Sequence, residues 1–303
     1  MKKKLIFYTV ALTAGLLTAC SSDDEQKQAP PVRHISVEVN QRPMNSDDPA
    51  GARSTDTRSA ITTTETLSKF YMRGIYSNLT SEYSVSKSND TWTVTPDTWP
   101  EDDFGNTAPN ETKVPFYAFT DGTDGTFYAN SGTPYISFTI AENASTQHDL
   151  LVAKNTVSYN DHQGKVPLTF DHACAAVAFN VQITKTLKTK LGTTLTVNSI
   201  VLRNVSNSGK YYFGTSTWGD VSGSAYYTLT SGNITVDTEA QALSSNYLFV
   251  IPQTRAVNGT TGTYLEINYT LSGSKQATIP LAVDWVAGSK YTINIKLGTG
   301  LIQ

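Results

Sequence analysis

Short segments in which apolar and polar residues alternate recur along most of this chain. The clearest runs from Lys290 to Leu297, where every second residue from Tyr291 onward is apolar. Alternation with a period of two is typical of a β-strand that buries one face. Glycine and asparagine interrupt these segments about every eight to twelve residues, and few segments have the 3.6-residue period of a helix. The pattern predicts an all-β protein built from β-sandwiches.

The segment Ile35–Val39 is predicted to be the first strand of this fold. Ile35, Val37 and Val39 fall on one face, and polar residues occupy the other. A polar stretch, residues 40–64, follows before the next alternating segment begins. Because connections of about 25 residues without regular structure are uncommon in compact domains, we expect this loop to serve a function or to be processed.

The chain begins with a different kind of segment, which is typical of a bacterial lipoprotein signal. Three lysines at positions 2–4 precede an apolar run, which ends in Leu17-Thr-Ala-Cys20. Small residues before a cysteine allow a lipoprotein signal peptidase to cut, and the Cys20 thiol would then carry a lipid. The run is too short for a final transmembrane helix. Residues 1–19 are therefore predicted to be a signal peptide and 20–32 a tether. The alternative is an ordinary signal peptide with an incidental cysteine.

Charge and cysteine content narrow the classes of function. Removing residues 1–19 lowers the count of basic residues from 23 to 20 against 26 acidic ones, so the mature chain has a net charge of about −6. Such a balance argues against a nucleic-acid partner. Once Cys20 is lipidated, Cys174 is the remaining cysteine, so neither a disulfide within one chain nor a Cys-x-x-Cys metal site can form. We expect no cofactor.

The length of the mature chain, 284 residues, is sufficient for two domains. Residues 155–164 are polar and rich in turn-forming residues, which makes them the best candidate boundary. We therefore expect an N-terminal β-sandwich over residues 33–158 and a C-terminal β-sandwich over residues 159–303.

An ordered set of motifs follows residue 145, and each of them is weak alone. They are Asp149-Leu-Leu-Val-Ala153, Val166-Pro-Leu-Thr-Phe170-Asp-His172, Phe249-Val-Ile-Pro252-Gln253, Ala277-Thr-Ile-Pro280-Leu281 and Trp285-Val-Ala-Gly288-Ser-Lys-Tyr291-Thr-Ile-Asn-Ile. In their order and spacing over residues 145–298 they resemble the fimbrillin family, the pilus subunits and anchors of Bacteroidales. The first half of the chain is similar to that family only in architecture.

The resemblance implies two tandem transthyretin-like β-sandwich domains and a structural, adhesive protein that is not an enzyme. In that family a lipidated precursor reaches the outer membrane, an arginine-specific protease removes the N-terminal strand, and a strand of another fimbrial subunit fills the groove by donor-strand exchange. Excising strand Ile35–Val39 would expose unpaired backbone groups and apolar pockets, which an incoming strand satisfies. The expected locations are the outer membrane for the lipid-anchored precursor and an extracellular fimbrium for the mature subunit.

Two arginines, Arg53 and Arg58, lie in the loop between the removable strand and the next strand. Cleavage after either would release the first strand together with the Cys20 anchor, so lipid attachment and polymerisation would exclude one another. Arg58 is slightly favoured, because cleavage there leaves less of the loop on the new N-terminus. The alternative interpretation is that arginines are simply common in polar linkers.

The segment after the last predicted strand is short. It comprises residues 298–303 and contains Leu301 and Ile302 as its only large apolar residues. Six residues span at most about 20 Å, which makes a poor donor strand. We expect a subunit that accepts a strand without donating one, which would place it at the fimbrial tip. Alternatively, strand Lys290–Leu297 swaps out as the donor, or an uncleaved chain remains an anchor.

Catalytic and metal-binding chemistry has little support in the sequence. Cys174 and His172 would share one face of a strand, but the apolar neighbours of Cys174 indicate a small buried thiol. His162, Asp171 and His172 are a conceivable metal set, yet Asp171 and His172 would point to opposite faces of a strand. We expect no metal site, and a structural hydrogen bond for His172.

Aromatic residues supply the rival hypothesis. Trp218, Tyr226 and Tyr227 lie in a glycine-rich stretch with polar neighbours, and exposed aromatic rings can stack on sugars. These three residues are therefore a candidate ligand platform, which would make the protein a monomeric surface lipoprotein that binds glycans. Most aromatic residues of a sandwich instead fill its core.

Overall fold

The first sheet of the computed structural model contains seven strands within the described residues, which are 32–46, 62, 65–120, 125–129, 133–244 and 246–302. The strand order is β1 (Ser36–Gln41), β10 (Lys165–His172), β9 (Leu151–Val157), β6 (Val114–Phe119), β3 (Lys69–Tyr76), β4 (Leu79–Ser88) and β5 (Thr91–Thr95). β1 runs parallel to β10, whereas all other neighbours in this sheet are antiparallel.

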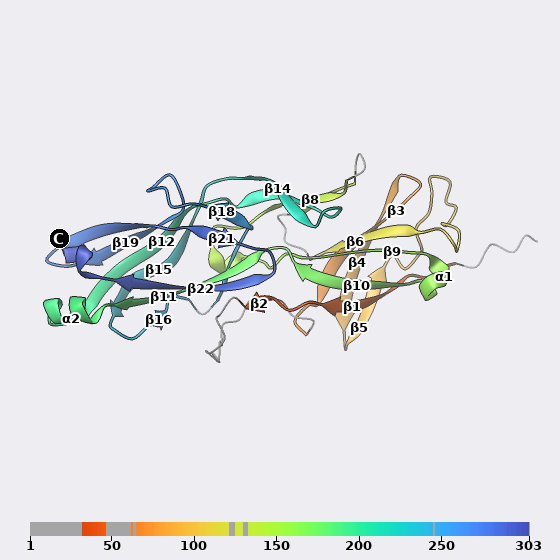
Figure 1. The fold of residues 1–303 in the computed structure, drawn as a ribbon. Helices are drawn as coiled ribbons and strands as arrows, with labels where there is room; N and C mark the ends of the chain where they lie inside the picture. The colour runs from red at the N-terminus through yellow and green to blue at the C-terminus, as the bar shows by residue number, and fades with distance from the viewer. Residues whose placement is uncertain are drawn as a thin grey trace, which may run out of the picture. The chain divides into compact units, whose positions relative to one another are not determined.

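The two edges of this sheet approach each other near the start of β1. His34 forms an antiparallel bridge with Thr98, and the Ile35 amide donates to the Asp97 carbonyl oxygen at 2.7 Å. The chain that leads into β1 therefore lies between β10 and the segment that follows β5 (Figure 1).

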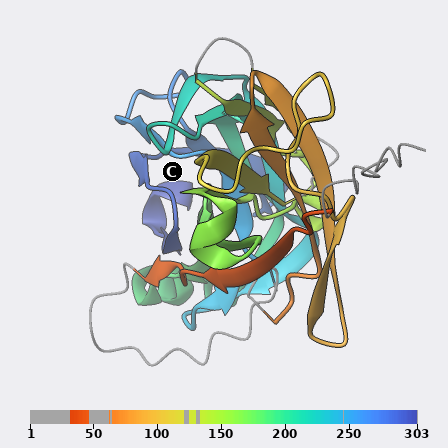
Figure 2. The same cartoon turned by 90° about the vertical axis from the view of Figure 1, so that its right-hand side faces the viewer.

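The remaining sheets form the second part of the fold. One sheet has the order β16 (Gln241–Ala242), β11 (Ala175–Ile183), β22 (Ser289–Leu297) and β2 (Asn45–Ser46), with β17 (Leu248–Val250) also on β11. A second sheet has the order β15 (Ala225–Val236), β12 (Leu195–Val205), β19 (Tyr264–Thr270) and β20 (Ser274–Pro280). A third has the order β14 (Thr217–Ser222), β13 (Ser208–Tyr212), β8 (Tyr135–Thr139) and β7 (Gly125–Tyr128). The last pairs β18 (Gln253–Arg255) with β21 (Val283–Trp285). Figure 2 shows the same fold turned by 90° from the view of Figure 1.

The described part of the chain has four short helical turns, of which three connect strands and the fourth follows β22. They are η2 (Ala144–Thr146), α1 (Tyr159–His162), α2 (Lys185–Leu191) and η3 (Thr299–Ile302). In this part of the chain no helix is long and apolar enough to cross a membrane. The expectation of an all-β sandwich fold is confirmed.

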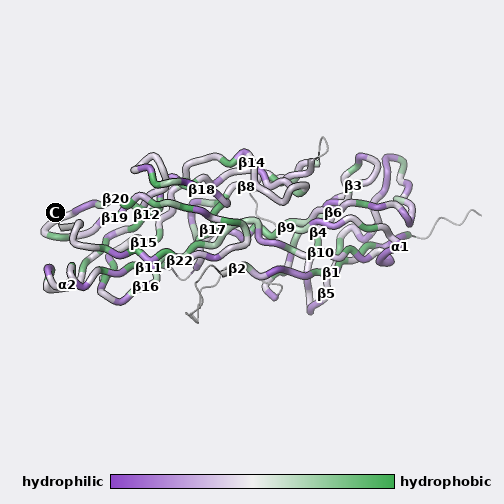
Figure 3. The backbone as a smooth tube through the Cα atoms, in the orientation of Figure 1, coloured by the Kyte–Doolittle hydropathy of each residue, from purple (hydrophilic) through white to green (hydrophobic). Residues whose placement is uncertain are grey.

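Inward-facing strand residues build two apolar cores. Inside the first sheet Phe70 of β3 packs edge-on against Phe170 of β10, with ring centroids 5.0 Å apart. The other sheets enclose a larger core, in which β11 is buried along most of its length. A strand covered on both faces needs few polar residues, whereas half-buried strands alternate. Figure 3 shows this alternation of hydrophobic and hydrophilic residues along many strands.

Strand pairing crosses residue 158, where the sequence places the boundary between two domains. β10 follows that boundary but pairs with β1 and β9, which precede it. β7 and β8 precede the boundary, yet β8 pairs with β13. Residues 33–303 cluster as one compact unit. The division at residue 158 stays a prediction, and the sheets do not follow it.

Replacing Phe170 with alanine should lower the free energy of unfolding by about 3–5 kcal/mol, because the fully buried ring leaves a cavity beside Phe70. Urea unfolding of the purified protein measures the loss. The control is Phe104→Ala, at a side chain that is 89% exposed, which should change stability by less than about 0.5 kcal/mol. Equal effects of the two substitutions would contradict this packing.

Candidate functional site

The candidate site is the position that β1 occupies at the edge of the first sheet. Its parallel register sets Val37 beside Val166, Val39 beside Leu168, and Gln41 beside Phe170. Val37 and Val39 are half-buried and pack against the core of the first sheet. Strand positions 36, 38 and 40 are exposed. The alternation of apolar and polar residues predicted from the sequence is therefore present in β1, and its apolar residues hold the strand against the core.

Ile35 anchors the beginning of β1 most deeply. Its side chain is only 4% exposed and belongs to the core of the first sheet. At the other end, the Arg42 amide donates to the Phe170 carbonyl oxygen at 2.9 Å. We call the surface of β10 and of residues 97–99 that receives β1 the β1 groove.

The chain continues from β1 onto a second edge. Met44 is buried in the larger core, and the Asn45 amide donates to the Gly288 carbonyl oxygen at 2.7 Å. β2 then pairs in parallel with β22, but only at Ser289 and Lys290. Among the described residues no strand pairs with 292–297 on that side of β22. The edge that receives β2 thus extends beyond it.

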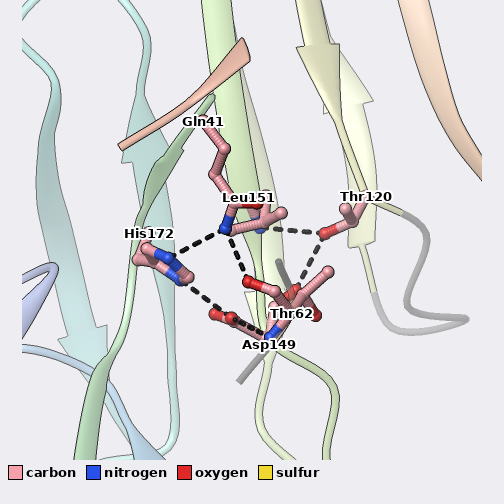
Figure 4. Close-up of polar contacts among 6 residues, drawn as sticks. All are labelled: Gln41, Thr62, Thr120, Asp149, Leu151 and His172. Atoms are coloured by element: carbon pink, nitrogen blue, oxygen red, sulfur yellow. Dashed lines mark hydrogen bonds and ion pairs between the residues drawn. The ribbon is translucent and has the colours of Figure 1, made fainter. Parts of the chain in front are cut away.

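A buried polar cluster closes the far end of the β1 groove (Figure 4). The side-chain nitrogen of Gln41, Nε2, donates to the Thr62 carbonyl oxygen at 2.6 Å and contacts His172 Nε2 at 3.0 Å. His172 Nδ1 lies 2.8 Å from Asp149 Oδ2, which also accepts from the Thr62 amide at 3.2 Å. We call these four residues the clasp.

The hydrogen bonds of the clasp determine which atom carries each proton. Because the Gln41 Nε2 faces a carbonyl oxygen, the amide cannot be turned round without placing two oxygens in contact. The same nitrogen must then donate to His172 Nε2, which leaves the imidazole proton on Nδ1, where it is donated to Asp149. The His172 side chain is 2% exposed and that of Asp149 is fully buried. Both partners of this hydrogen bond therefore lie away from solvent.

Thr120 holds the strand start that carries Asp149. Its hydroxyl donates to the Asp149 carbonyl oxygen at 2.9 Å and accepts from the Leu151 amide at 2.9 Å (Figure 4). The side-chain acceptors Asp149 Oδ1 and Gln41 Oε1 are buried without a hydrogen-bond partner among the described residues. The clasp therefore holds more acceptors than donors.

The clasp includes residues that the sequence did not single out. Gln41 continues the face of Val37 and Val39 two residues further on, which is the one signal that points to it. Asp149 stood in one of the family motifs but without a predicted role, and Thr62 gave no signal. The structural hydrogen bond expected for His172 is present, but its partners are Asp149 and Gln41 in the first sheet.

Other predicted residues lie partly outside the described structure. Cys20, Arg53 and Arg58 fall outside the described residues. The described chain stops at Ser46 and returns at Thr62, so these two arginines lie in the segment between them. The removable strand of the sequence prediction is β1.

The candidate platform of Trp218, Tyr226 and Tyr227 is not one surface. Tyr227 is fully buried, and burial raises the pKa of its hydroxyl. The half-buried Trp218 donates its indole N–H to the Ala173 carbonyl oxygen at 2.7 Å. Tyr226 is 49% exposed and carries the Arg203 guanidinium over its ring at 5.5 Å. Of the three, Tyr226 is the side chain that is well placed to meet a ligand.

The candidate catalytic thiol and the candidate metal ligands are not arranged for chemistry either. Cys174 is completely buried, and the loss of hydration raises the pKa of its thiol. Asp171 pairs with Arg42 at 2.7 Å on the surface, whereas His172 faces the interior. The described residues contain no group of three or more His, Cys, Asp or Glu side chains that could hold a metal ion.

Comparison with known families covers almost the whole described chain. A family model described as fimbrillin-like matches residues 37–303, from within β1 to the end of the chain. The protein belongs to the fimbrillin-like family. Membership of this family confirms the resemblance predicted from residues 145–298 and extends it over the first half. No curated protein matches the chain.

Solved structures of low sequence identity share this fold. A fimbrial protein from Bacteroides vulgatus ATCC 8482 has a TM-score of 0.60 and 19% identity, over 89% of this chain and 96% of that one. A candidate cell adhesion protein from Parabacteroides distasonis ATCC 8503 has a TM-score of 0.55 and 9% identity, over 88% of each chain. Another from Bacteroides ovatus ATCC 8483 has a TM-score of 0.52 and 15% identity, over 88% and 93%.

Replacing Asp149 with alanine should lower the free energy of unfolding by more than about 2 kcal/mol, because it leaves two buried donors without an acceptor. These are His172 Nδ1 and the Thr62 amide. Urea unfolding measures the effect. Asp171→Ala is the matched control, since its ion pair with Arg42 is exposed and is worth less than about 1 kcal/mol. A clasp without structural importance would give two similar losses.

Proposed function

We propose that this protein is an adhesive subunit of an extracellular fimbria, and that it accepts a strand from a neighbouring subunit in place of β1. Its membership of the fimbrillin-like family supports a fimbrial role at the cell surface. The similar structures include a fimbrial protein and candidate cell adhesion proteins. The position of β1 is the observation that supports strand exchange most directly.

The departure of β1 would break one strand pairing, that with β10, together with the bridge between His34 and Thr98. β1 is an edge strand that pairs along its length with one strand, β10. Its loss would expose the backbone edge of β10 and the apolar surface beneath Val37 and Val39. Unpaired backbone groups above apolar pockets favour the addition of another strand.

Arg53 and Arg58 lie between Ser46, the last described residue after β1, and Thr62, where the described chain returns. Gln41 and Thr62 lie on the two sides of this segment and are hydrogen-bonded to each other. Cleavage after either arginine would cut the covalent connection between β1 and the strands that follow it in the chain. We propose that an arginine-specific protease makes this cut, and that it releases the Cys20 lipid anchor of the exported precursor together with β1.

A longer incoming strand could follow the path of β1 and β2 along both edges. Beyond the two residues paired with β2, the side of β22 at 292–297 offers further backbone groups to such a strand. β22 itself is a poor donor, because it pairs with β11 at eight positions and buries Ile295 and Leu297. We therefore propose that the subunit accepts a strand and keeps β22. A tip position in the fimbria is the matching hypothesis.

Limited digestion with an arginine-specific protease should cut the purified protein first after Arg53 or Arg58, as mass spectrometry of the fragments will show. The nicked protein should keep β1 bound, because its pairing with β10 and the burial of Ile35 do not depend on the loop. The double variant Arg53→Gln, Arg58→Gln should resist this first cut. Initial cleavage elsewhere in the chain would contradict the proposed maturation.

A polar cavity beside Tyr226 favours a second candidate function, glycan binding. The cavity has a volume of about 600 Å³, within the usual range for ligand pockets. Its lining consists of Glu142, Asn143, Ala144, Ser145, Tyr226, Thr228, Ser244 and Asn246. Hydroxyl and amide groups around one exposed aromatic ring suit a neutral sugar.

Under this second function, Tyr226→Ala should weaken binding to a surface polysaccharide at least tenfold, because it removes the only aromatic ring in the described lining. A glycan array followed by titration measures the affinity. Tyr128→Ala is the control, since Tyr128 is a similarly exposed tyrosine outside this lining. If both variants keep the affinity of the parent protein, the cavity is not the glycan site.

A further inference from the structure

The β1 groove is apolar along most of its length and polar at one end. The strand positions that face inward are Ile35, Val37, Val39 and Gln41, each two residues after the one before. The first three contact the core of the first sheet. The fourth meets the clasp.

Most of the clasp belongs to the part of the chain that would remain after cleavage. Asp149 and His172 are in strands or strand ends of the first sheet, and Thr62 follows both Arg53 and Arg58 in the sequence. Only Gln41 would leave with β1. An empty groove would therefore present His172 Nε2 and the Thr62 carbonyl oxygen as two acceptors that have lost their donor.

We propose that these two acceptors select and align the incoming strand by requiring a carboxamide side chain, glutamine or asparagine, at the position of Gln41. This inference rests on the proposed strand exchange and specifies the partner. The partner strand has apolar residues at three alternate positions, and the carboxamide stands two residues after the third. It runs in the direction of β1.

The chemistry of the clasp excludes most other side chains at this position. One nitrogen must supply two N–H groups, to acceptors 2.6 Å and 3.0 Å away, which an NH2 group does and a hydroxyl cannot. A carboxylate would face His172 Nε2 and the Thr62 carbonyl oxygen without a proton to donate, near the buried carboxylate of Asp149. An apolar residue would leave both acceptors buried and unpaired.

The same clasp would fix the register of exchange. Valine or isoleucine residues alone define an apolar face that fits equally well when the strand slides by two residues. Sliding by two places an apolar residue at the clasp or the carboxamide in the apolar part of the groove, and each placement buries polar groups without partners. A single buried polar residue that specifies register is a recognised role for such groups.

Peptide exchange into the nicked protein tests this proposal. The acceptor is the full chain cut in the loop at Arg53 or Arg58, unfolded in urea and refolded with an excess of peptide, so that the peptide competes with the released β1 for the groove. The probe is a fluorescent peptide of residues 33–44 of this chain, and its incorporation is followed by size-exclusion chromatography and by its dissociation rate. Three altered peptides carry Gln41→Leu, Gln41→Glu or Asn40→Leu. Asn40 is the matched control, because it is an adjacent amide that faces outward.

The wild-type and Asn40→Leu peptides should be incorporated equally well, and the two Gln41 variants should dissociate about tenfold faster or more. An acceptor that carries His172→Leu should bind the wild-type and Gln41-variant peptides with more similar dissociation rates. If that acceptor variant does not fold, the peptide series on the unaltered acceptor still tests the proposal. Equal incorporation of all four peptides would overturn the clasp proposal and leave strand exchange standing. Failure of every peptide, the wild type included, would contradict strand exchange itself, and the clasp proposal with it.

Discussion

The place of β1 is the constraint on which the first sheet depends. The strand completes the backbone pairing of β10, and Ile35 fills part of the core beneath it. The residues just before β1 also bond to the segment after β5, so one strand joins both edges of the sheet. Without it, apolar core surface and a row of unpaired backbone groups would face water. The fold therefore needs a strand in this groove, from its own chain or from another.

The buried carboxylate and imidazole at the end of the groove contribute in a different way from the apolar residues. Apolar contacts supply most of the free energy of strand binding, but they distinguish poorly between registers. Asp149 and His172 lie in a nearly dry environment in which every unmet hydrogen bond is costly. Replacing such a pair with apolar residues often preserves stability, so its presence is better explained by specificity.

The alternation of apolar and polar residues was sufficient to predict individual half-buried strands. The alternation at Ile35–Val39 and at Lys290–Leu297 predicted β1 and β22, because a half-buried strand leaves a period of two in the sequence. The turn between β4 and β5, where Asn89 and Asp90 both adopt positive φ, was not predicted. Tyr226 and Tyr227 are neighbours in sequence, yet one is exposed and one is buried, because successive strand residues point to opposite faces. The predicted platform, which included both, overlooked this alternation.

Long-range pairing could not be predicted in this way. No local pattern shows that β10 joins the first sheet across the expected domain boundary, or that β8 joins β13. The clasp is beyond sequence reasoning for the same reason, since Gln41 and His172 are 131 residues apart. The family match gives the kind of protein. It does not give the pairing of β10 with β1, the pairing of β8 with β13 or the hydrogen bonds of the clasp.

The most direct test of strand exchange is the N-terminal sequence and mass of the protein in fimbriae sheared from cells of its native host. If β1 is replaced by a neighbour's strand, the assembled subunit begins at Ser54 or Ser59 and carries no lipid. An assembled subunit that still begins at an acylated Cys20 would retain β1 in its groove and would contradict the account.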